Sequence, residues 1–174
     1  QRLAEHFGPG PLTLSVPRRP GRAEAAAAGL PTVGLRCPSH PVARAVLAAA
    51  ARAGILGLAA PSANRFGRVS PTTAAHVAAE FGDALLVLDG GACAVGIESA
   101  IVDASRGQPV LLRPGALSRA ELEHVAGQPF ADPHALAQPA PRASGTLEAH
   151  YAPQATVRLM DAKALQAALD VLAA

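Results

Sequence analysis

The sequence predicts an α/β (α+β) fold, with a twisted mixed sheet of five or six strands flanked by helices. Short apolar runs alternate along the chain with stretches of helical periodicity, which is the pattern of this class. The 16 glycines and 16 prolines indicate many turns and strand ends, and they argue against a long helical bundle. Half of the 174 residues are hydrophobic but only 3% are aromatic, so the core has to be built from alanine, valine and leucine.

Five elements are expected before residue 61. Leu3, Ala4 and Phe7 share one helical face, and the GPGP segment that follows ends this helix. Ser39 is placed to cap a helix that starts at Pro41, and because this helix is apolar on most sides, we expect it to be largely buried. In chain order the elements are a helix over 1–7, strands over 12–16 and 32–36, a helix over 41–53 and a strand over 56–60.

Five further elements are expected up to residue 126. Ser118 stands at the N-cap of the last helix with Glu121 in its first turn, which is close to a capping box. Pro114 and Gly115 stop the strand before it. In chain order the elements are a helix over 72–81, a strand over 85–88, a short strand within 95–103, a strand over 110–113 and a helix over 119–126.

The rest of the chain predicts a linker and the beginning of a second domain. Residues 127–146 are rich in Pro, Ala, Gln and Gly and have no clean period. A strand over 155–160 and a helix over 161–174, with Asp161 as N-cap, then form one βα unit. We therefore expect a first domain over 1–126, a linker over 127–153 and the start of a second domain over 154–174. Because the chain opens on the end of a helix without an initiator methionine, we expect it to begin inside the first domain.

Charge and cysteine content argue against several kinds of protein. The net charge of +2 is too small to predict nucleic-acid binding, and the only lysine, Lys163, lies too late in the chain for a Walker-type phosphate loop. Cys37 and Cys93 are far apart, so we expect small buried residues in a reducing compartment and neither a disulfide nor a structural metal. Without a signal peptide or an apolar run of membrane-spanning length, we expect a cytoplasmic protein with no membrane contact.

The stretch Pro61–Thr73, PSANRFGRVSPTT, is the first candidate for a binding site. It carries Ser62, Asn64 and Ser70 between a predicted strand and a predicted helix, where α/β proteins commonly bind ligands. Its hydroxyls, its two arginines and the N–H groups at the start of the next helix favour an anion such as phosphate. The alternative is a surface loop in which Ser70 or Thr72 caps the helix and Asn64 closes a turn.

Polar residues also stand at the ends of other predicted strands, namely Thr32, Arg36, Glu98, Ser99 and Arg113. Each has a structural explanation by itself; Arg36 and Arg113, for example, could pair with Asp89 or Asp103. Together they predict one site for a polyanion and a small polar molecule. No nucleophile–base arrangement accompanies them, so an enzyme built on this site would orient its substrates and stabilise phosphate charge. Nucleotidyl or acyl-adenylate chemistry fits that description.

Five segments of the chain occur in the order found in the YrdC-like family, namely FGPGPLTLSV, TVGLRCPSHPVA, APSANRFGRVSPTTAAHV, LDGGACAVGIESAIVD and LLRPGALS. The chain resembles this family over about residues 1–118, and HYAP at 150–153, followed by a βα unit, resembles its longer two-domain form, the threonylcarbamoyl-AMP synthases. The resemblance implies a sheet around a concave, positively charged cavity. It also implies that the family's N-terminal part, with a basic KxR signature, is missing here, so we expect the chain to be inactive alone.

The resemblance further implies an activity and a set of contacts. Members of the family condense L-threonine, bicarbonate and ATP, with Mg²⁺ accompanying the ATP, into threonylcarbamoyl-AMP and pyrophosphate. A partner complex then transfers the threonylcarbamoyl group to an adenosine of tRNA. Carried over position by position, the ATP contacts are Thr32, Ser62, Asn64, Ser70, Arg113 and, as a lid residue, Tyr151. The threonine contacts are Arg36, Ala60 and Ser99.

Two other functions are left open. One is an RNA-binding module without catalysis, which the small net charge and the scarcity of aromatic residues disfavour. The other is the carbamoyl-transfer branch of the same family, which normally carries zinc-finger cysteines that this sequence lacks.

Overall fold

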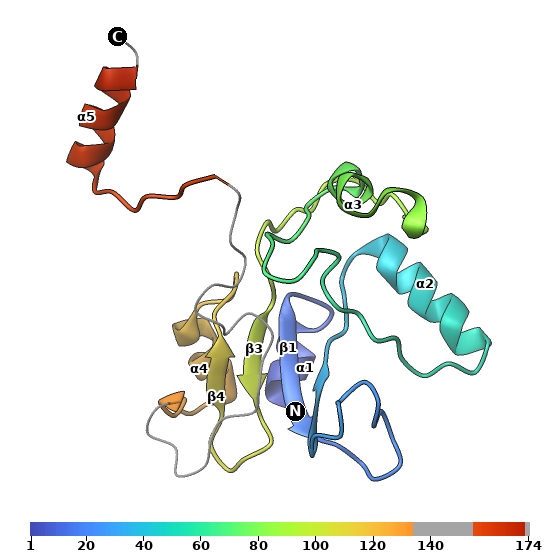
Figure 1. Cartoon of the computed structure of the whole chain (residues 1–174). Helices are drawn as coiled ribbons and strands as arrows, with labels where there is room; N and C mark the ends of the chain where they lie inside the picture. Colours follow the sequence, from blue (N-terminus) through green and yellow to red (C-terminus); the bar gives the residue numbers. More distant parts are fainter. Residues whose placement is uncertain (134–154, 173–174) are drawn as a thin grey trace.

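A mixed α/β architecture is present in the computed structural model, which describes residues 1–133 and 155–172 (Figure 1). The predicted fold class is therefore confirmed. The elements, in chain order, are α1 (Arg2–Phe7), β1 (Leu12–Pro17), β2 (Thr32–Leu35), α2 (Pro41–Arg52), α3 (Ala74–Phe81), the 3₁₀ turn η1 (Gly82–Ala84), β3 (Ala100–Asp103), β4 (Val110–Arg113), α4 (Arg119–Ala126) and α5 (Ala162–Leu172).

The four strands form one sheet in the order β2-β1-β3-β4. β1 runs parallel to β3, with Leu12 opposite Ala100, while β2 and β4 run antiparallel to their neighbours. The starts of β1 and β3 therefore lie at the same edge of the sheet as the ends of β2 and β4. We call this edge the upper edge, as it is drawn in Figure 1.

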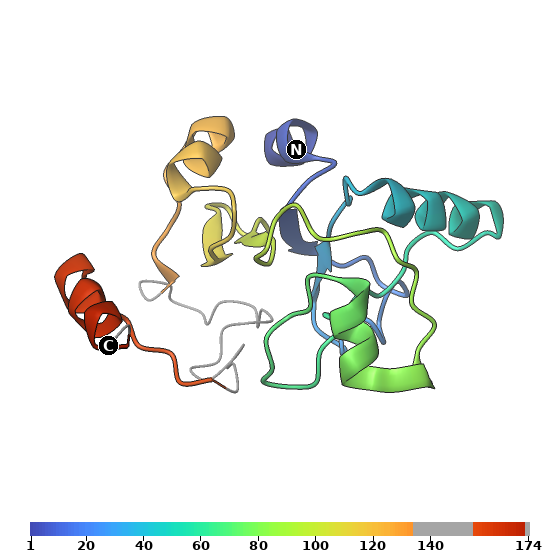
Figure 2. The ribbon, with the colours of Figure 1, turned by 90° about the horizontal axis from the view of Figure 1, so that it is seen from above.

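One face of the sheet carries the hydrophobic core. Alternation along β1 and β3 turns Leu12, Ala100 and Val102 toward α1 and α4, which cover this face (Figure 2). Leu122 of α4 is completely buried there. Phe130, which the sequence places in the linker, is only 4% exposed in the same core, so the first residues after α4 pack with the first domain.

The other face of the sheet carries most of its polar side chains. The register of the strands turns five polar or charged side chains to this side, beside the apolar Ile101 and Val110, and we call the five the polar face: Thr13, Ser15, Thr32, Asp103 and Arg113. Helix α3 and the loops around it lie on this side of the sheet (Figure 2).

Several elements expected from the sequence are absent, and these predictions were wrong. Residues 56–60, 85–88 and 155–160 are not strands, so the described residues form four strands instead of five or six. The expectation that helix α2 is largely buried was also wrong, because none of its residues is buried. In two of the segments that are not strands, the side chains of Leu56 and Leu86 are 89% and 93% exposed. An apolar segment becomes a strand only where a neighbouring strand binds its N–H and C=O groups. Among the described residues, no strand pairs with any of these three segments.

The helix caps match the sequence in part. Ser118 and Glu121 form a complete capping box, and Asp161 Oδ1 accepts a hydrogen bond of 2.7 Å from Ala164 N, as predicted. The cap of α2 is His40 and not Ser39, and the cap of α3 is Thr73 and neither Ser70 nor Thr72. The expectation of buried cysteines was also wrong, because both Cys37 and Cys93 are exposed.

Removing the Ser118 hydroxyl is expected to destabilise α4. Ser118→Ala should lower the free energy of unfolding by about 1 kcal/mol in urea titrations, because an N–H group at the start of the helix loses its acceptor. The Ser118 side chain also holds the pKa of Glu121 below its usual value. This lowered pKa stabilises the fold above the pKa of the unfolded chain and ceases to do so as the pH falls through the folded value, so the loss should shrink in acid.

Ser39→Ala is the matched control, since Ser39 is exposed beside α2 but does not cap it. Its unfolding free energy should stay within about 0.5 kcal/mol of the starting protein. Equal losses in the two variants would contradict a specific role for the Ser118 cap.

Candidate functional site

The loop 61–73 is organised around the amide of Asn64. Its Nδ2 donates hydrogen bonds to Arg65 O at 3.0 Å and to Arg68 O at 3.1 Å, and its Oδ1 accepts one from Ser70 Oγ at 3.4 Å. These bonds fold residues 64–70 into a closed loop, which begins and ends at the predicted contacts Asn64 and Ser70. Gly67 provides the left-handed turn within it, with φ +80°. The structure thus brings Asn64 and Ser70 together, with the amide of Asn64 engaged inside the loop.

A cavity of about 280 Å³ lies between this loop and helix α3. The loop is held to the helix by Arg65 N, which donates to Glu80 Oε1 at 3.1 Å. The lining residues are Ala63, Asn64, Val69, Ser70, Pro71, Thr72, His76, Glu80 and Gly96. Sequence reasoning missed His76 and Glu80, although their spacing of four residues on a helix places them on one side.

A second group of polar residues lies at the upper edge of the sheet. Arg113 at the end of β4 donates to Ser99 O from Nε at 3.1 Å and from Nη2 at 2.9 Å. The same Nη2 lies 3.4 Å from Ser99 Oγ, and Thr13 Oγ1 lies 2.8 Å from that oxygen. We call Thr13, Ser99 and Arg113 the edge cluster. Thr13 was not among the residues singled out in the sequence.

Arg36 lies at the same edge, just after β2. Its Nε donates to Gly10 O at 3.1 Å, and Gly10 N donates to Cys37 O at 2.9 Å, so the segment before β1 is held against the end of β2. The sequence also suggested Asp103 as a partner for Arg36 or Arg113, and this was wrong. The carboxylate of Asp103 accepts a hydrogen bond of 2.9 Å from Arg106 Nε.

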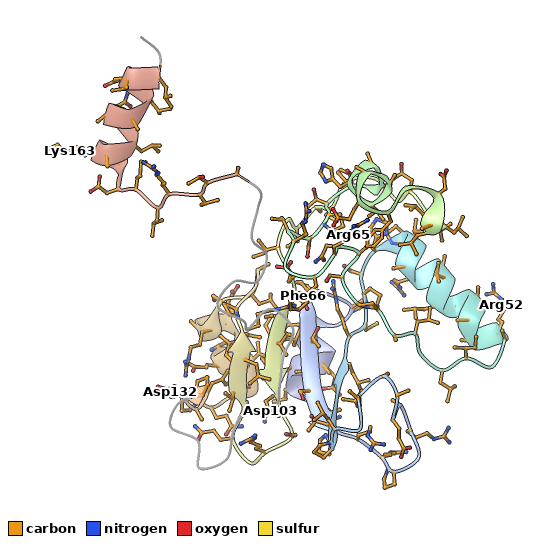
Figure 3. All side chains as sticks on the ribbon, viewed as in Figure 1. Arg52, Arg65, Phe66, Asp103, Asp132 and Lys163 are labelled. Carbon is orange, nitrogen blue, oxygen red and sulfur yellow. The ribbon has the colours of Figure 1, made fainter. Side chains whose placement is uncertain are left out.

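The remaining predicted contacts lie elsewhere. Thr32 begins β2 opposite Pro17, at the lower edge of the sheet and away from the edge cluster. Ala60 and Ser62 are exposed in the segment that leads into the loop and do not line its cavity. Tyr151 lies outside the described residues. The loop belongs to the upper end of the sheet: Figure 3 shows Phe66 beyond that end and Asp103 toward the opposite one.

The chemistry available at the upper edge is that of a hydrogen-bond donor site. Guanidinium groups donate only, and hydroxyls beside them can complete the binding of carboxylate or phosphate oxygens. Among residues 1–133 and 155–172, no group of three or more His, Cys, Asp or Glu side chains is placed to hold a metal ion. In the same ranges no helix combines the length and the apolar character needed to cross a bilayer.

Comparison with known proteins places these motifs in a family. Residues 1–115 match the family Sua5_yciO_yrdC, described as telomere recombination, and residues 117–173 match the threonylcarbamoyl-AMP synthase C-terminal domain, Sua5_C. A threonylcarbamoyl-AMP synthase of Pyrococcus abyssi is 38% identical over 164 residues, which cover 92% of this chain and 47% of that protein. One from Bacillus subtilis is 38% identical over 162 residues, 91% of this chain and 46% of that protein.

A solved structure extends the likeness to the fold. The crystal structure of Pyrococcus abyssi Sua5 complexed with L-threonine has a TM-score of 0.77 and 35% identity, covering 98% of this chain and 51% of that chain. The chain thus spans about half the length of the relatives that it matches.

Proposed function

The chain belongs to the Sua5/YciO/YrdC family, and from this we propose that it serves in the synthesis of threonylcarbamoyl-AMP from L-threonine, bicarbonate and ATP, with release of pyrophosphate. The observation that carries the proposal is the edge cluster, in which Arg113 of β4, the Thr13 hydroxyl of β1 and the hydroxyl of Ser99, just before β3, meet at the upper edge of the sheet. The likeness to two threonylcarbamoyl-AMP synthases supports the choice of reaction.

The proposed roles follow from the donors at each place. Arg36 and Ser99, with the backbone of Ala60, contact threonine, and Arg113 serves the nucleotide beside them. Ser62, Asn64 and Ser70 present the loop to the ATP phosphates, Thr32 adds a further contact, and Tyr151 closes over the nucleotide. Magnesium enters as part of the Mg²⁺–ATP substrate, since phosphate oxygens are ligands that it prefers.

The chain's own contribution to the reaction is placement and charge. Holding carbamate and α-phosphate in line removes most of the entropy cost of their encounter, and fixed guanidinium groups stabilise charge on the departing pyrophosphate. No side chain has to form a covalent intermediate. We assign the reaction to residues 1–126, with a linker over 127–153 and the start of a second domain over 154–174.

The match of residues 117–173 to a threonylcarbamoyl-AMP synthase domain favours this reaction over the carbamoyl-transfer branch. The product would pass to the complex that modifies tRNA, so weak RNA contact and a cytoplasmic location belong to the same proposal.

The test is a pyrophosphate-release assay on the chain, both alone and extended at its N-terminus. We expect release from the extended chain only when L-threonine and bicarbonate are both present with Mg²⁺–ATP. Ser62→Ala should weaken ATP binding by about tenfold, the usual effect of one hydrogen bond to a charged group. Release that does not depend on both co-substrates would refute the reaction, and RNA binding that falls steeply with salt in its place would indicate a binding module.

A further inference from the structure

Thr13 is the one member of the edge cluster without an assigned role. Its side chain faces both neighbouring strands: Oγ1 lies 2.8 Å from Ser99 Oγ, and Cγ2 faces Gly34 of β2, where an added Cβ would lie 3.5 Å from it. The methyl group thus points toward β2 and the hydroxyl toward the start of β3. The parallel pairing of β1 with β3 sets this geometry.

The hydrogen atoms of the cluster can be counted. Arg113 Nη2 only donates, so Ser99 Oγ accepts from it. One hydroxyl hydrogen lies between Thr13 Oγ1 and Ser99 Oγ, whichever of the two donates. The pair has two such hydrogens, so one is left to be donated outside the pair. Within the described residues no hydrogen bond takes it up, and of the two residues Ser99 is only 6% exposed and Thr13 is half-buried.

A buried hydroxyl hydrogen without an acceptor is costly, and an acceptor on a bound ligand removes that cost. The remaining hydroxyl hydrogen is a donor, and it lies beside the fixed positive charge of Arg113. This arrangement favours a carboxylate, and the positive charge of the guanidinium disfavours an ammonium group.

We propose that Thr13 is a positioning residue, which holds the Ser99 hydroxyl so that the Thr13–Ser99 pair donates its remaining hydrogen to the carboxylate of the amino-acid substrate. This proposal rests on the proposed function, and it adds both a residue and the polarity of the contact. Thr13 acts through Ser99 and does not take part in the chemistry.

Thr13→Val tests the proposal, because it removes the hydroxyl and keeps the shape. In the N-terminally extended chain, we expect the KM for L-threonine to rise about tenfold, while the KM for ATP and kcat at saturating threonine stay within about twofold. Thr13→Ser keeps the hydroxyl and should restore the threonine KM. Ser15→Ala, on the same strand and face, is the matched control and should leave all three values unchanged.

A double-mutant cycle and a substrate analogue decide whether Thr13 acts through Ser99. Ser99→Ala should raise the threonine Kd in calorimetry by about tenfold, and Thr13→Val in that background should add less than twofold. Thr13→Val should also weaken the binding of L-threonine more than the binding of L-threoninamide, which lacks the carboxylate charge.

The proposal would be overturned if the losses of threonine affinity in Thr13→Val and Ser99→Ala multiplied in the double variant. It would also be overturned if Thr13→Val lost equal affinity for threonine, threoninamide and ATP, or if its threonine KM were unchanged. Failure of the proposed function is a different result, because it appears in the starting protein as pyrophosphate release that needs neither threonine nor bicarbonate. If Thr13→Val does not fold, the threonine Kd of Thr13→Ser is compared with that of Ser99→Ala in the same calorimetry. Thr13→Ser should bind threonine like the starting protein, and a tenfold loss of threonine affinity in this variant would refute the proposal.

Discussion

Replacement of Arg113 by alanine is expected to weaken ATP binding by about tenfold to hundredfold and L-threonine binding by a similar factor. A hydrogen bond to a charged group contributes about 1.5–3 kcal/mol, and this side chain supplies several. Two of them hold the carbonyl of Ser99, at 2.9 and 3.1 Å, so the loss of Arg113 also releases the residue proposed to contact threonine. Titration calorimetry with each ligand measures both effects.

Arg113→Lys separates the two roles of this side chain. Lysine keeps the positive charge but cannot place two N–H groups on one carbonyl oxygen. We therefore expect ATP binding to be largely retained and threonine binding to fall. Unchanged affinity for both ligands in Arg113→Ala would show that the upper edge of the sheet is not the site.

Replacement of Gly115 by alanine is expected to lower the free energy of unfolding by about 3 kcal/mol, at the upper end of the usual cost of overpacking. A Cβ at this position would collide with the backbone nitrogen of Ala100 and lie 2.8 Å from Glu98 O and 2.9 Å from Ser99 C. These are backbone atoms, so no side chain can rotate to make room. The strand end that carries Ser99 has to move.

Gly107→Ala is the matched control for this substitution. Gly107 has no atom within 4 Å of a built Cβ, and its side chain would enter open space. Its unfolding free energy should stay within about 0.5 kcal/mol of the starting protein. Urea titrations measure the stabilities, and threonine binding in the folded fraction of Gly115→Ala reports whether Ser99 has been displaced. Equal stability of the two variants would contradict the close approach of Gly115 to β3.

Local signals in the sequence were sufficient where neighbours along the chain supply the stabilising contact. Ser118 and Glu121 lie three residues apart, and their capping box was nearly readable from that spacing alone. The strands that became β1, β2 and β4 and the polar loop after residue 61 were also predicted. For the capping box and the loop, the pattern of residues and the structure depend on the same short-range interactions.

Long-range pairing is where sequence reasoning failed. Leu56 and Leu86 stand in runs that look like strands, but a strand needs a partner whose position no local pattern reveals. Thr13 escaped notice for a related reason: a threonine inside a strand is ordinary, and only the pairing of β1 with β3 brings it to Ser99. Residues that matter through a distant neighbour have no signature of their own.

The pairing of β1 with β3 also determines when these four strands can complete their sheet during translation. Ala100 and the rest of β3 leave the ribosome only after β1, β2, α2 and α3 have been made. Until then β2 is the only one of the other three described strands that can pair with β1, and two paired strands alone are at best marginally stable in water. Synthesis of β3 is therefore the step that allows this part of the sheet to become stable.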